Sequence, residues 1–189
     1  MKVFFTGSPR ALNTLKAEHE SIFKAIENNG GINLSKLVIE AQPEAFYEVN
    51  HPEVVKHYQK TMNDLKKSDI LVAEVSTHSM SMGFLINKAL QQNKFVLALY
   101  LPDHKPFFLS GIENDKLMTS EYTKNNIEKV IKEAFDRAVE LTDTRFNFYI
   151  SPEIGRYLDW ISQHKKLPRA VFLRSLLEKS MKTEKDFES

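Results

Sequence analysis

Short apolar runs alternate with amphipathic patterns along the first 141 residues, and this alternation limits the possible folds more than any other feature. Apolar runs predict buried strands at 2–6, 36–41, 69–75 and 95–101, with a short edge strand at 116–120. Apolar residues spaced three and four apart predict helices at 12–28, 51–66, 79–92 and 124–141. The sequence therefore predicts an α/β fold with a doubly wound, Rossmann-like parallel sheet.

Composition narrows the class of protein. Of the 189 residues, 42% are hydrophobic and 27% are charged, which is typical of a globular protein with a sizeable core. The chain has no cysteine, which excludes disulfides, thiolate nucleophiles and cysteine-ligated zinc or iron–sulfur sites. The six histidines lack close metal-ligand spacing, so we expect no metal site and no cofactor. No run is long enough to span a membrane, and we expect a cytoplasmic protein without a membrane partner.

Charge divides the chain near residues 142–144. Residues 145–182 carry eight basic and three acidic residues, whereas residues 1–143 carry seventeen and nineteen. We therefore expect two domains, 1–142 and 143–189. A basic segment suggests a polyanionic partner, although a solvated charged surface explains the charge alone at least as well.

The C-terminal segment combines a strand pattern with two helical patterns. Residues 145–150 alternate polar and apolar side chains, Ser151-Pro152 can open a helix, and Pro168 can start a second one. Fewer than forty residues in this order cannot bury their own apolar faces. We therefore expect two copies to pair their strands and interlock their helices, giving a homodimer or a higher even oligomer.

This order of elements resembles the ribbon-helix-helix family of bacterial repressors and antitoxins over about residues 144–181. The resemblance implies that a two-stranded ribbon enters the major groove of DNA. It implies base contacts and phosphate contacts from Arg145, Asn147, Tyr149, Lys165, Lys166 and Arg169. The alternative is a plain dimerisation segment whose ribbon does not meet DNA. The turn between the helices also lacks the glycine that many members of the family carry.

Two stretches of the first domain carry signals for ligand binding. The first is the Gly7-Ser8 turn after the first strand, followed by Arg10. A glycine lets backbone approach a ligand, and amides at a helix start attract anions. The second is the buried strand from Asp69 to Val75 with its Ser-rich turn, which leads through Ser79 into a helix containing Gly83. Ligands of open α/β sheets bind beyond the carboxyl ends of the strands, where Glu74 and Ser79 are expected.

Together these stretches resemble the nucleoside 2-deoxyribosyltransferase family, which includes the deoxynucleoside 5′-monophosphate N-glycosidases, over about residues 1–141. The resemblance implies that the domain holds a nucleoside or a nucleotide. Carried over by position, it implies a ligand-binding set of Gly7, Ser8, Arg10, Asp69, Ser79 and Gly83.

One departure from the family affects catalysis. In the family, the glycine at the helix start is followed by an apolar residue and then by a glutamate that acts at the anomeric carbon of the sugar. Here Gly83-Phe84 is followed by Leu85, which cannot form a glycosyl intermediate or stabilise an oxocarbenium ion. We therefore assign no catalytic residue, and only Glu74 and Asp69 remain as weak candidates for a substitute carboxylate.

Three functions are compatible with these features. The leading hypothesis is a DNA-binding transcriptional regulator whose first domain is a catalytically silent sensor of a nucleotide-like small molecule. The second is an active nucleoside or nucleotide N-glycosidase or deoxyribosyltransferase. The third is an antitoxin or an assembly scaffold. The sequence leaves the ligand and any operator unidentified.

Overall fold

The computed structural model describes residues 1–40, 50–141 and 148–184. The chain divides into two compact units, Met1–Thr144 and Arg145–Ser189. Each unit is considered by itself. Within the described ranges, no helix combines the length and the apolar character needed to cross a membrane.

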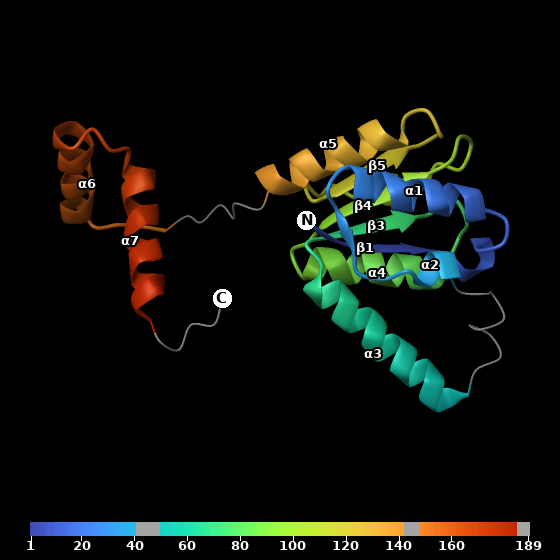
Figure 1. Cartoon of the computed structure of the whole chain (residues 1–189). Coiled ribbons are helices and arrows are strands. Elements are labelled where there is room, and N and C mark those ends of the chain that lie inside the picture. Colours follow the sequence, from blue (N-terminus) through green and yellow to red (C-terminus); the bar gives the residue numbers. More distant parts are fainter. Residues whose placement is uncertain (41–49, 142–147, 185–189) are drawn as a thin grey trace. The chain divides into compact units, whose positions relative to one another are not determined.

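The first unit is built on a five-stranded parallel sheet in the order β2-β1-β3-β4-β5 (Figure 1). The strands are β1 (Lys2–Gly7), β2 (Ile32–Asn33), β3 (Ile70–Glu74), β4 (Phe95–Tyr100) and β5 (Leu117–Glu121). Each pair of neighbouring strands is parallel. This confirms the predicted α/β fold with a doubly wound parallel sheet, and β5 lies at the sheet edge as the sequence indicates.

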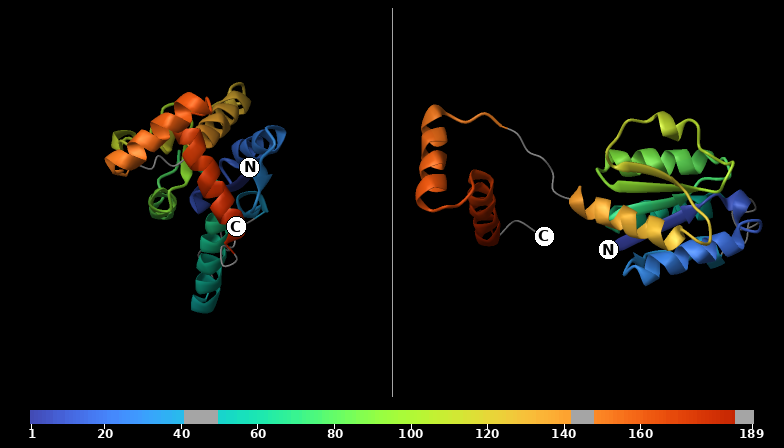
Figure 2. Two further views of the ribbon diagram at one scale, coloured as in Figure 1. Left: turned by 90° about the vertical axis from the view of Figure 1, so that its left-hand side faces the viewer. Right: turned by 90° about the horizontal axis from the view of Figure 1, so that it is seen from above.

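Helices cover both faces of the sheet (Figures 1 and 2). Alternate residues of β1 separate the two cores: Val3 and Phe5 join one apolar cluster and Phe4 joins the other. On the first face pack α1 (Lys16–Asn28) and α5 (Ile127–Glu140). On the second face pack α4 (Met80–Gln91) and the end of α3 (His51–Lys67). The first ten residues of α3 are all exposed, and this part of the helix leads away from the sheet.

The strand order creates a crevice at one edge of the sheet. The chain passes from β1 to β2 on one side and then places β3 on the other side of β1. At such a reversal the connections leave the sheet in opposite directions, so a crevice opens beyond the carboxyl ends of the two central strands. The register pairs Gly7 at the end of β1 with Glu74 at the end of β3. A ligand site is therefore expected directly beyond Gly7 and Glu74.

The predicted strand at 36–41 is wrong. Leu37–Glu40 forms the short helix α2, and the second strand is Ile32–Asn33 instead. An apolar run of this length fits a buried strand and a buried helical turn equally well. Val38 still reaches the core, so the apolar pattern identifies burial but not the backbone conformation. The helix predicted from residue 12 also starts later, at Lys16, after a single 3-10 turn at Pro9–Ala11 (η1).

The connection between β4 and β5 contains another 3-10 turn at Leu109–Gly111 (η3). The exposed aromatic residues Phe107 and Phe108 precede it.

The second unit contains two helices, α6 (Pro152–His164) and α7 (Arg169–Thr183). The hydroxyl of Ser151 accepts a hydrogen bond from the Ile154 amide at 3.3 Å, which confirms the predicted helix start. Of the strand predicted at 145–150, residues 145–147 lie outside the described residues. Residues 148–150 have no regular secondary structure. The paired ribbon therefore stays a prediction.

Candidate active site

A cavity of about 1090 Å³ opens at the predicted crevice, beyond the carboxyl ends of β1 and β3. Its volume is that of a site for a small organic ligand. Three segments form it: the turn after β1, the exposed part of α3, and the first turns of α4 with the residues before them. The described lining residues are Gly7, Pro9, Arg10, Leu12, Val38, Val54, His57, Tyr58, Thr61, Met62, His78, Ser79, Met80, Ser81, Met82, Phe84 and Leu85.

The turn after β1 supplies backbone and one cation. A Cβ on Gly7 would lie 2.9 Å from Nε2 of the buried His19, so a side chain at this position would displace the turn. Arg10 is exposed and is the one lysine or arginine among the described lining residues. An exposed guanidinium at the mouth of a cavity suits a phosphate group.

The start of α4 supplies further donors. Ser79 is the residue that precedes the helix, and its hydroxyl makes no capping hydrogen bond. The amides of the first helical turn have no partner within the helix and carry the positive end of its dipole. Ser79 and Arg10 thus place neutral and charged donors on the lining of the same cavity.

The remaining lining is apolar and partly aromatic. Tyr58 on α3 and Phe84 on α4 have ring centroids 6.4 Å apart at an interplanar angle of 44°. Both side chains are about half exposed, and both line the cavity. Aromatic faces of this kind bind the flat face of a heterocycle by stacking.

His57 is the titratable group on the α3 side of the cavity. Although His57 is exposed at the surface of α3, partial desolvation of its ring lowers the pKa of His57 below its usual range, and the positive charge of Lys60 lowers it further. The imidazole is therefore neutral near pH 7 and carries a nitrogen lone pair that can accept a proton.

A buried polar network lies behind Gly7. Oε1 of Glu74 accepts hydrogen bonds from the Ser76 amide at 3.1 Å, from the Ser76 hydroxyl, and from the Tyr122 hydroxyl at 3.5 Å. The Ser76 hydroxyl in turn accepts from the Leu101 amide at 2.8 Å. Burial, with the negative charges of Glu74 and Glu18, raises the pKa of Tyr122 far above its usual range, so it stays a donor. The network ties the carboxyl ends of the central strands together.

The other oxygen of Glu74, Oε2, faces His19. Nε2 of His19 lies 3.9 Å from this oxygen, and both side chains are fully buried. Among the described residues, neither Oε2 nor the two ring nitrogens make a hydrogen bond. Glu74 is also absent from the cavity lining, so its geometry suits support of the Gly7 turn better than contact with a ligand.

The cavity brings together only half of the predicted ligand-binding set. Gly7, Arg10 and Ser79 line it. Ser8 is fully buried and is not a lining residue, because the turn directs its side chain inward. Gly83 is exposed on α4 and does not line the cavity either.

Asp69 lies at the opposite end of the sheet. It precedes β3, and its Oδ2 accepts a hydrogen bond from the Lys2 amide at 2.6 Å. Parallel strands place all their amino ends at the edge away from the crevice, so Asp69 ties β1 to β3 and does not reach the cavity. Asp69 resembles the acidic residue that starts the corresponding strand in the family. In this structure, however, its carboxylate lies away from the cavity.

Leu85 occupies the place of the family glutamate and lines the cavity. It is 6% exposed and belongs to the apolar cluster between α4 and the sheet. None of the described lining residues carries a carboxylate. The cavity thus has Leu85 where the resemblance would place a glutamate, and Glu74 is not among its described lining residues.

Helix α3 contributes lining residues that are not among the residues predicted from the sequence. Val54, His57, Tyr58, Thr61 and Met62 recur at spacings of three and four on a helix that was itself predicted. Residues with this spacing share one face of the helix, and this spacing is the sequence signal by which they could be identified as cavity-lining residues.

The structure also places the residues expected to bind DNA. Arg145 and Asn147 lie outside the described residues. Lys165 and Lys166 are exposed in the turn between α6 and α7, and Lys166 adopts a φ of +51°, the conformation that a glycine would ease. Arg169 forms an ion pair with Asp159 on α6, so its guanidinium braces the two helices. Tyr149 is fully exposed.

Comparison with known proteins concerns the first unit. No family model matches the chain. A 2′-deoxynucleoside 5′-phosphate N-hydrolase 1 from Nematostella vectensis is 29% identical over 140 residues, covering 71% of this chain and 93% of the relative. The protein of the same name from Syntrophotalea carbinolica is 31% identical over 125 residues, covering 65% and 84%. A 5-hydroxymethyl-dUMP N-hydrolase from Danio rerio is 20% identical over 140 residues, covering 72% and 96%.

These relatives overturn the leading hypothesis from the sequence. They are named as enzymes that cleave nucleotides, and none of them supports DNA binding or transcriptional regulation. The hypothesis gave weight to the short C-terminal segment, Arg145–Ser189, whereas alignments of 125–140 residues are too long to lie mainly within that segment. The chain therefore belongs to the family of 2′-deoxynucleoside 5′-phosphate N-hydrolases through its nucleoside deoxyribosyltransferase-like first domain.

Proposed function

We propose that the first domain binds a 2′-deoxynucleoside 5′-phosphate in the cavity and hydrolyses its N-glycosidic bond. The observation that carries the proposal is the position of the cavity. It joins the Gly7 turn with Arg10 to the start of α4 with Ser79, and these are the segments in which the chain resembles the family. The names of the relatives support the same reaction class.

The lining suggests how such a ligand lies. Arg10 and Ser79, with the first amides of α4, receive the 5′-phosphate. The base lies against Tyr58 and Phe84, whose rings face the same cavity. This arrangement directs the anomeric carbon toward the region between Leu85 and His57, both of which line the cavity.

The bond is cleaved by direct attack of water. Water adds to C1′ and gives one proton to the neutral imidazole of His57, which acts as general base. The C1′–N bond breaks, its electron pair leaves with the base, and the base takes up a proton from solvent, while the His57 imidazolium returns its proton to solvent. The products are the free base and 2-deoxyribose 5-phosphate.

Leu85 determines two properties of this reaction. Because a leucine cannot form a glycosyl-enzyme intermediate, the sugar is not held for transfer to a second base, and hydrolysis with inversion is expected. The missing carboxylate also leaves the positive charge that develops on the sugar unstabilised. Such a loss raises a barrier by on the order of 5–8 kcal/mol, so we expect a slow enzyme.

The test is release of base from a panel of substrates. The full chain is incubated with the four 2′-deoxynucleoside 5′-monophosphates, the matching nucleosides and the ribonucleotides, and free base and sugar phosphate are separated by chromatography. Base release from the deoxynucleotides, with less from the nucleosides, is the expected result.

Arg10→Ala, purified in parallel, controls for a contaminating hydrolase. Since Arg10 supplies the cation of the phosphate site, this variant should lose at least about tenfold in kcat/KM, worth about 1.4 kcal/mol, on nucleotides only. Equal base release by both proteins, or no release by either, would show that the cavity does not catalyse this hydrolysis. Binding without release, measured by calorimetry, would likewise exclude the catalytic step.

A further inference from the structure

Four buried polar atoms in and behind the Gly7 turn make no hydrogen bond among the described residues. They are Oγ of Ser8, both ring nitrogens of His19 and Oε2 of Glu74. All three side chains are fully buried. Buried polar groups are almost always hydrogen-bonded, because an unpaired one costs free energy. Unpaired atoms gathered beside a ligand cavity therefore indicate a functional role.

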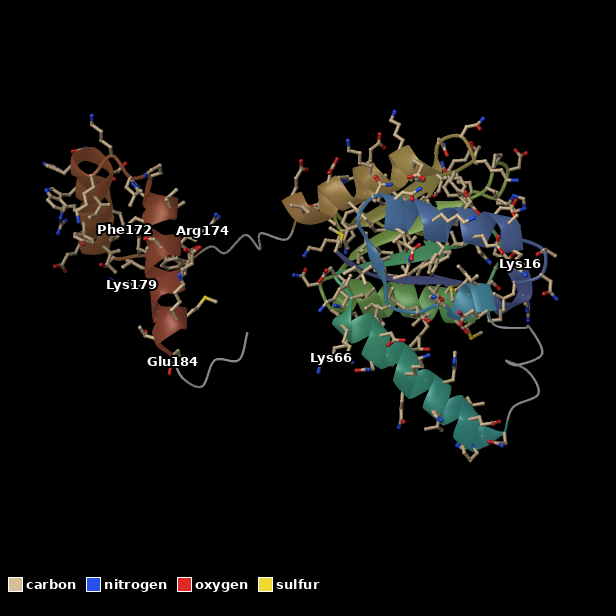
Figure 3. The ribbon with its side chains drawn as sticks, in the orientation of Figure 1. Lys16, Lys66, Phe172, Arg174, Lys179 and Glu184 are labelled. Atoms are coloured by element: carbon tan, nitrogen blue, oxygen red, sulfur yellow. The ribbon has the colours of Figure 1, made fainter. Side chains whose placement is uncertain are left out.

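His19 and Glu74 face each other without a hydrogen bond. His19 lies on α1, one turn after the helix start at Lys16 (Figure 3), and its ring packs edge-to-face with Phe5 on β1. Its Nε2 is 3.9 Å from Oε2 of Glu74, which is too far for a hydrogen bond. A proton between these two atoms would join them in a charge-assisted hydrogen bond of about 2.8 Å.

This pair is in contact with the turn that borders the cavity. A Cβ on Gly7 would lie 2.9 Å from Nε2 of His19 and 3.6 Å from Cβ of Glu74, so the turn rests against both side chains. Gly7 itself lines the cavity, as does Arg10. Closing the gap within the pair moves the ring by about 1 Å and therefore moves the backbone that faces the ligand.

We propose that His19 is a positioning residue of the phosphate site, and that it takes up a proton toward Glu74 when a phosphate group binds beyond Gly7. The inference rests on the phosphate site proposed above. The ligand brings negative charge near a buried carboxylate, and the low dielectric constant of the interior strengthens their repulsion. A proton on His19 offsets this repulsion and draws the ring toward Glu74. By linkage, the proton tightens phosphate binding by the same factor.

The groups around His19 favour the imidazole as the site of this proton. Glu74 on β3 faces it, and Glu18 on α1 adds negative charge to the same network. The Tyr122 hydroxyl, which follows β5, keeps its own proton because its pKa lies far above the usual range. β1 presents an aromatic ring and a glycine to the imidazole.

Calorimetry of the full chain measures this proton directly. The probe is 2-deoxyribose 5-phosphate, a product of the proposed reaction, titrated at pH 8 in two buffers of different ionisation enthalpy. At this pH a phosphate with a second pKa of about 6 is a dianion, and exposed histidines are neutral. We expect uptake of a large fraction of one proton per bound ligand, and a Kd that rises with pH by up to about tenfold per unit.

Two variants each remove one member of the pair. His19→Gln supplies an amide that can donate to Oε2 without charge, and Glu74→Gln keeps the imidazole in place. Both should abolish the proton uptake and the rise of Kd with pH. At pH 7 both should raise KM for deoxynucleotides up to about tenfold and leave kcat within about twofold, because the proton acts on phosphate binding. His78→Gln, which removes an exposed histidine of the cavity lining, is the matched control and should keep the uptake.

The outcomes separate this inference from the proposed function. Binding without proton uptake in the unmodified protein would overturn the inference and leave the phosphate site intact. Uptake that persists in either folded variant of the pair, or that is lost in His78→Gln, would assign the proton to another group and overturn it as well. Absence of binding would remove the phosphate site together with the inference.

Discussion

At the scale of single residues, Leu85 has the largest consequence for chemistry. It lines the cavity where the family has a glutamate, and no described lining residue replaces that carboxylate. We expect Leu85→Glu to raise kcat for deoxynucleotide hydrolysis by about 10⁴–10⁶-fold, the equivalent of roughly 5–8 kcal/mol, because a carboxylate there stabilises the cationic sugar. Steady-state release of free base measures the gain.

Leu85→Gln is the matched control for this prediction. It has nearly the same shape and polarity as the glutamate but no charge, so it should leave kcat near that of the unmodified protein. Both variants lose apolar contacts in the cluster around Leu65 and Ile86, at a cost of about 1–3 kcal/mol in folding free energy. An equal gain with Gln and Glu, or no gain with Glu, would contradict the electrostatic explanation.

His57 gives the reaction a characteristic pH dependence. Partial desolvation lowers the pKa of His57, so the imidazole becomes protonated only below the usual value of about 6.5, and only the neutral form accepts a proton from water. The kcat should therefore rise with pH in the acid range and reach a plateau before neutrality. His57→Gln should lower the plateau about 10²-fold and abolish the rise. An unchanged acid limb in His57→Gln would assign the titration to another group.

The limits of sequence reasoning are clearest at Ser8 and Asp69. Both match family positions, and both flank the correct strands. Whether a side chain enters the cavity depends on how the turn directs it and on which end of the strand it occupies. The cavity includes Gly7 and Arg10 but not the buried Ser8, and Asp69 lies at the amino end of β3. The local sequence pattern predicts which strand or turn a residue lies in. The direction in which its side chain points is known only from the packed structure.

At the scale of helices and strands, the regular spacing of apolar residues in a long helix predicts the element better than a short apolar run does. The helix at 51–67 has an Asn50 cap whose side chain accepts from the Glu53 amide, with Pro52 in the first turn, and its start was predicted correctly. The segment Leu37–Glu40 has no residue that marks a helix start, and its apolar pattern predicts a strand although it forms a helix. Its helical form depends on packing with α1 and β1, which no local pattern encodes.

Gly7, which lines the cavity, and Gly83, which does not, should respond oppositely to an added methyl group. A Cβ on Gly83, within α4, meets no atom within 4 Å, so Gly83→Ala should stabilise the domain by about 0.5–1 kcal/mol through helix propensity. Gly7→Ala should destabilise it and weaken nucleotide binding, because the new methyl meets His19 at 2.9 Å. Chemical denaturation and calorimetric titration with a deoxynucleotide measure both effects. Weaker nucleotide binding by Gly83→Ala would show that Gly83 contributes to the site after all.

At the scale of the whole molecule, the proposed catalysis and the expected association are assigned to different units. Each cluster of the apolar core consists of residues from Met1–Thr144, and neither cluster contains Leu158 or Ile161. A ligand that binds the folded first domain stabilises that domain, by about 2.7 kcal/mol at a hundred times its Kd. Dilution weakens a unit whose folding requires a second copy. The two treatments should therefore act on different unfolding transitions.

Tryptophan fluorescence can separate these transitions because Trp160 reports on the second unit only, while far-UV circular dichroism reports on both. In urea, the Trp160 transition should move to lower denaturant on tenfold dilution and stay in place when a deoxynucleotide is added. The remaining dichroism transition should move to higher denaturant with the nucleotide. Leu177→Glu should lower only the Trp160 transition and leave kcat/KM within about twofold, since it lies outside the cavity. A Trp160 transition that follows the nucleotide and ignores dilution would contradict this assignment of stability to the two units.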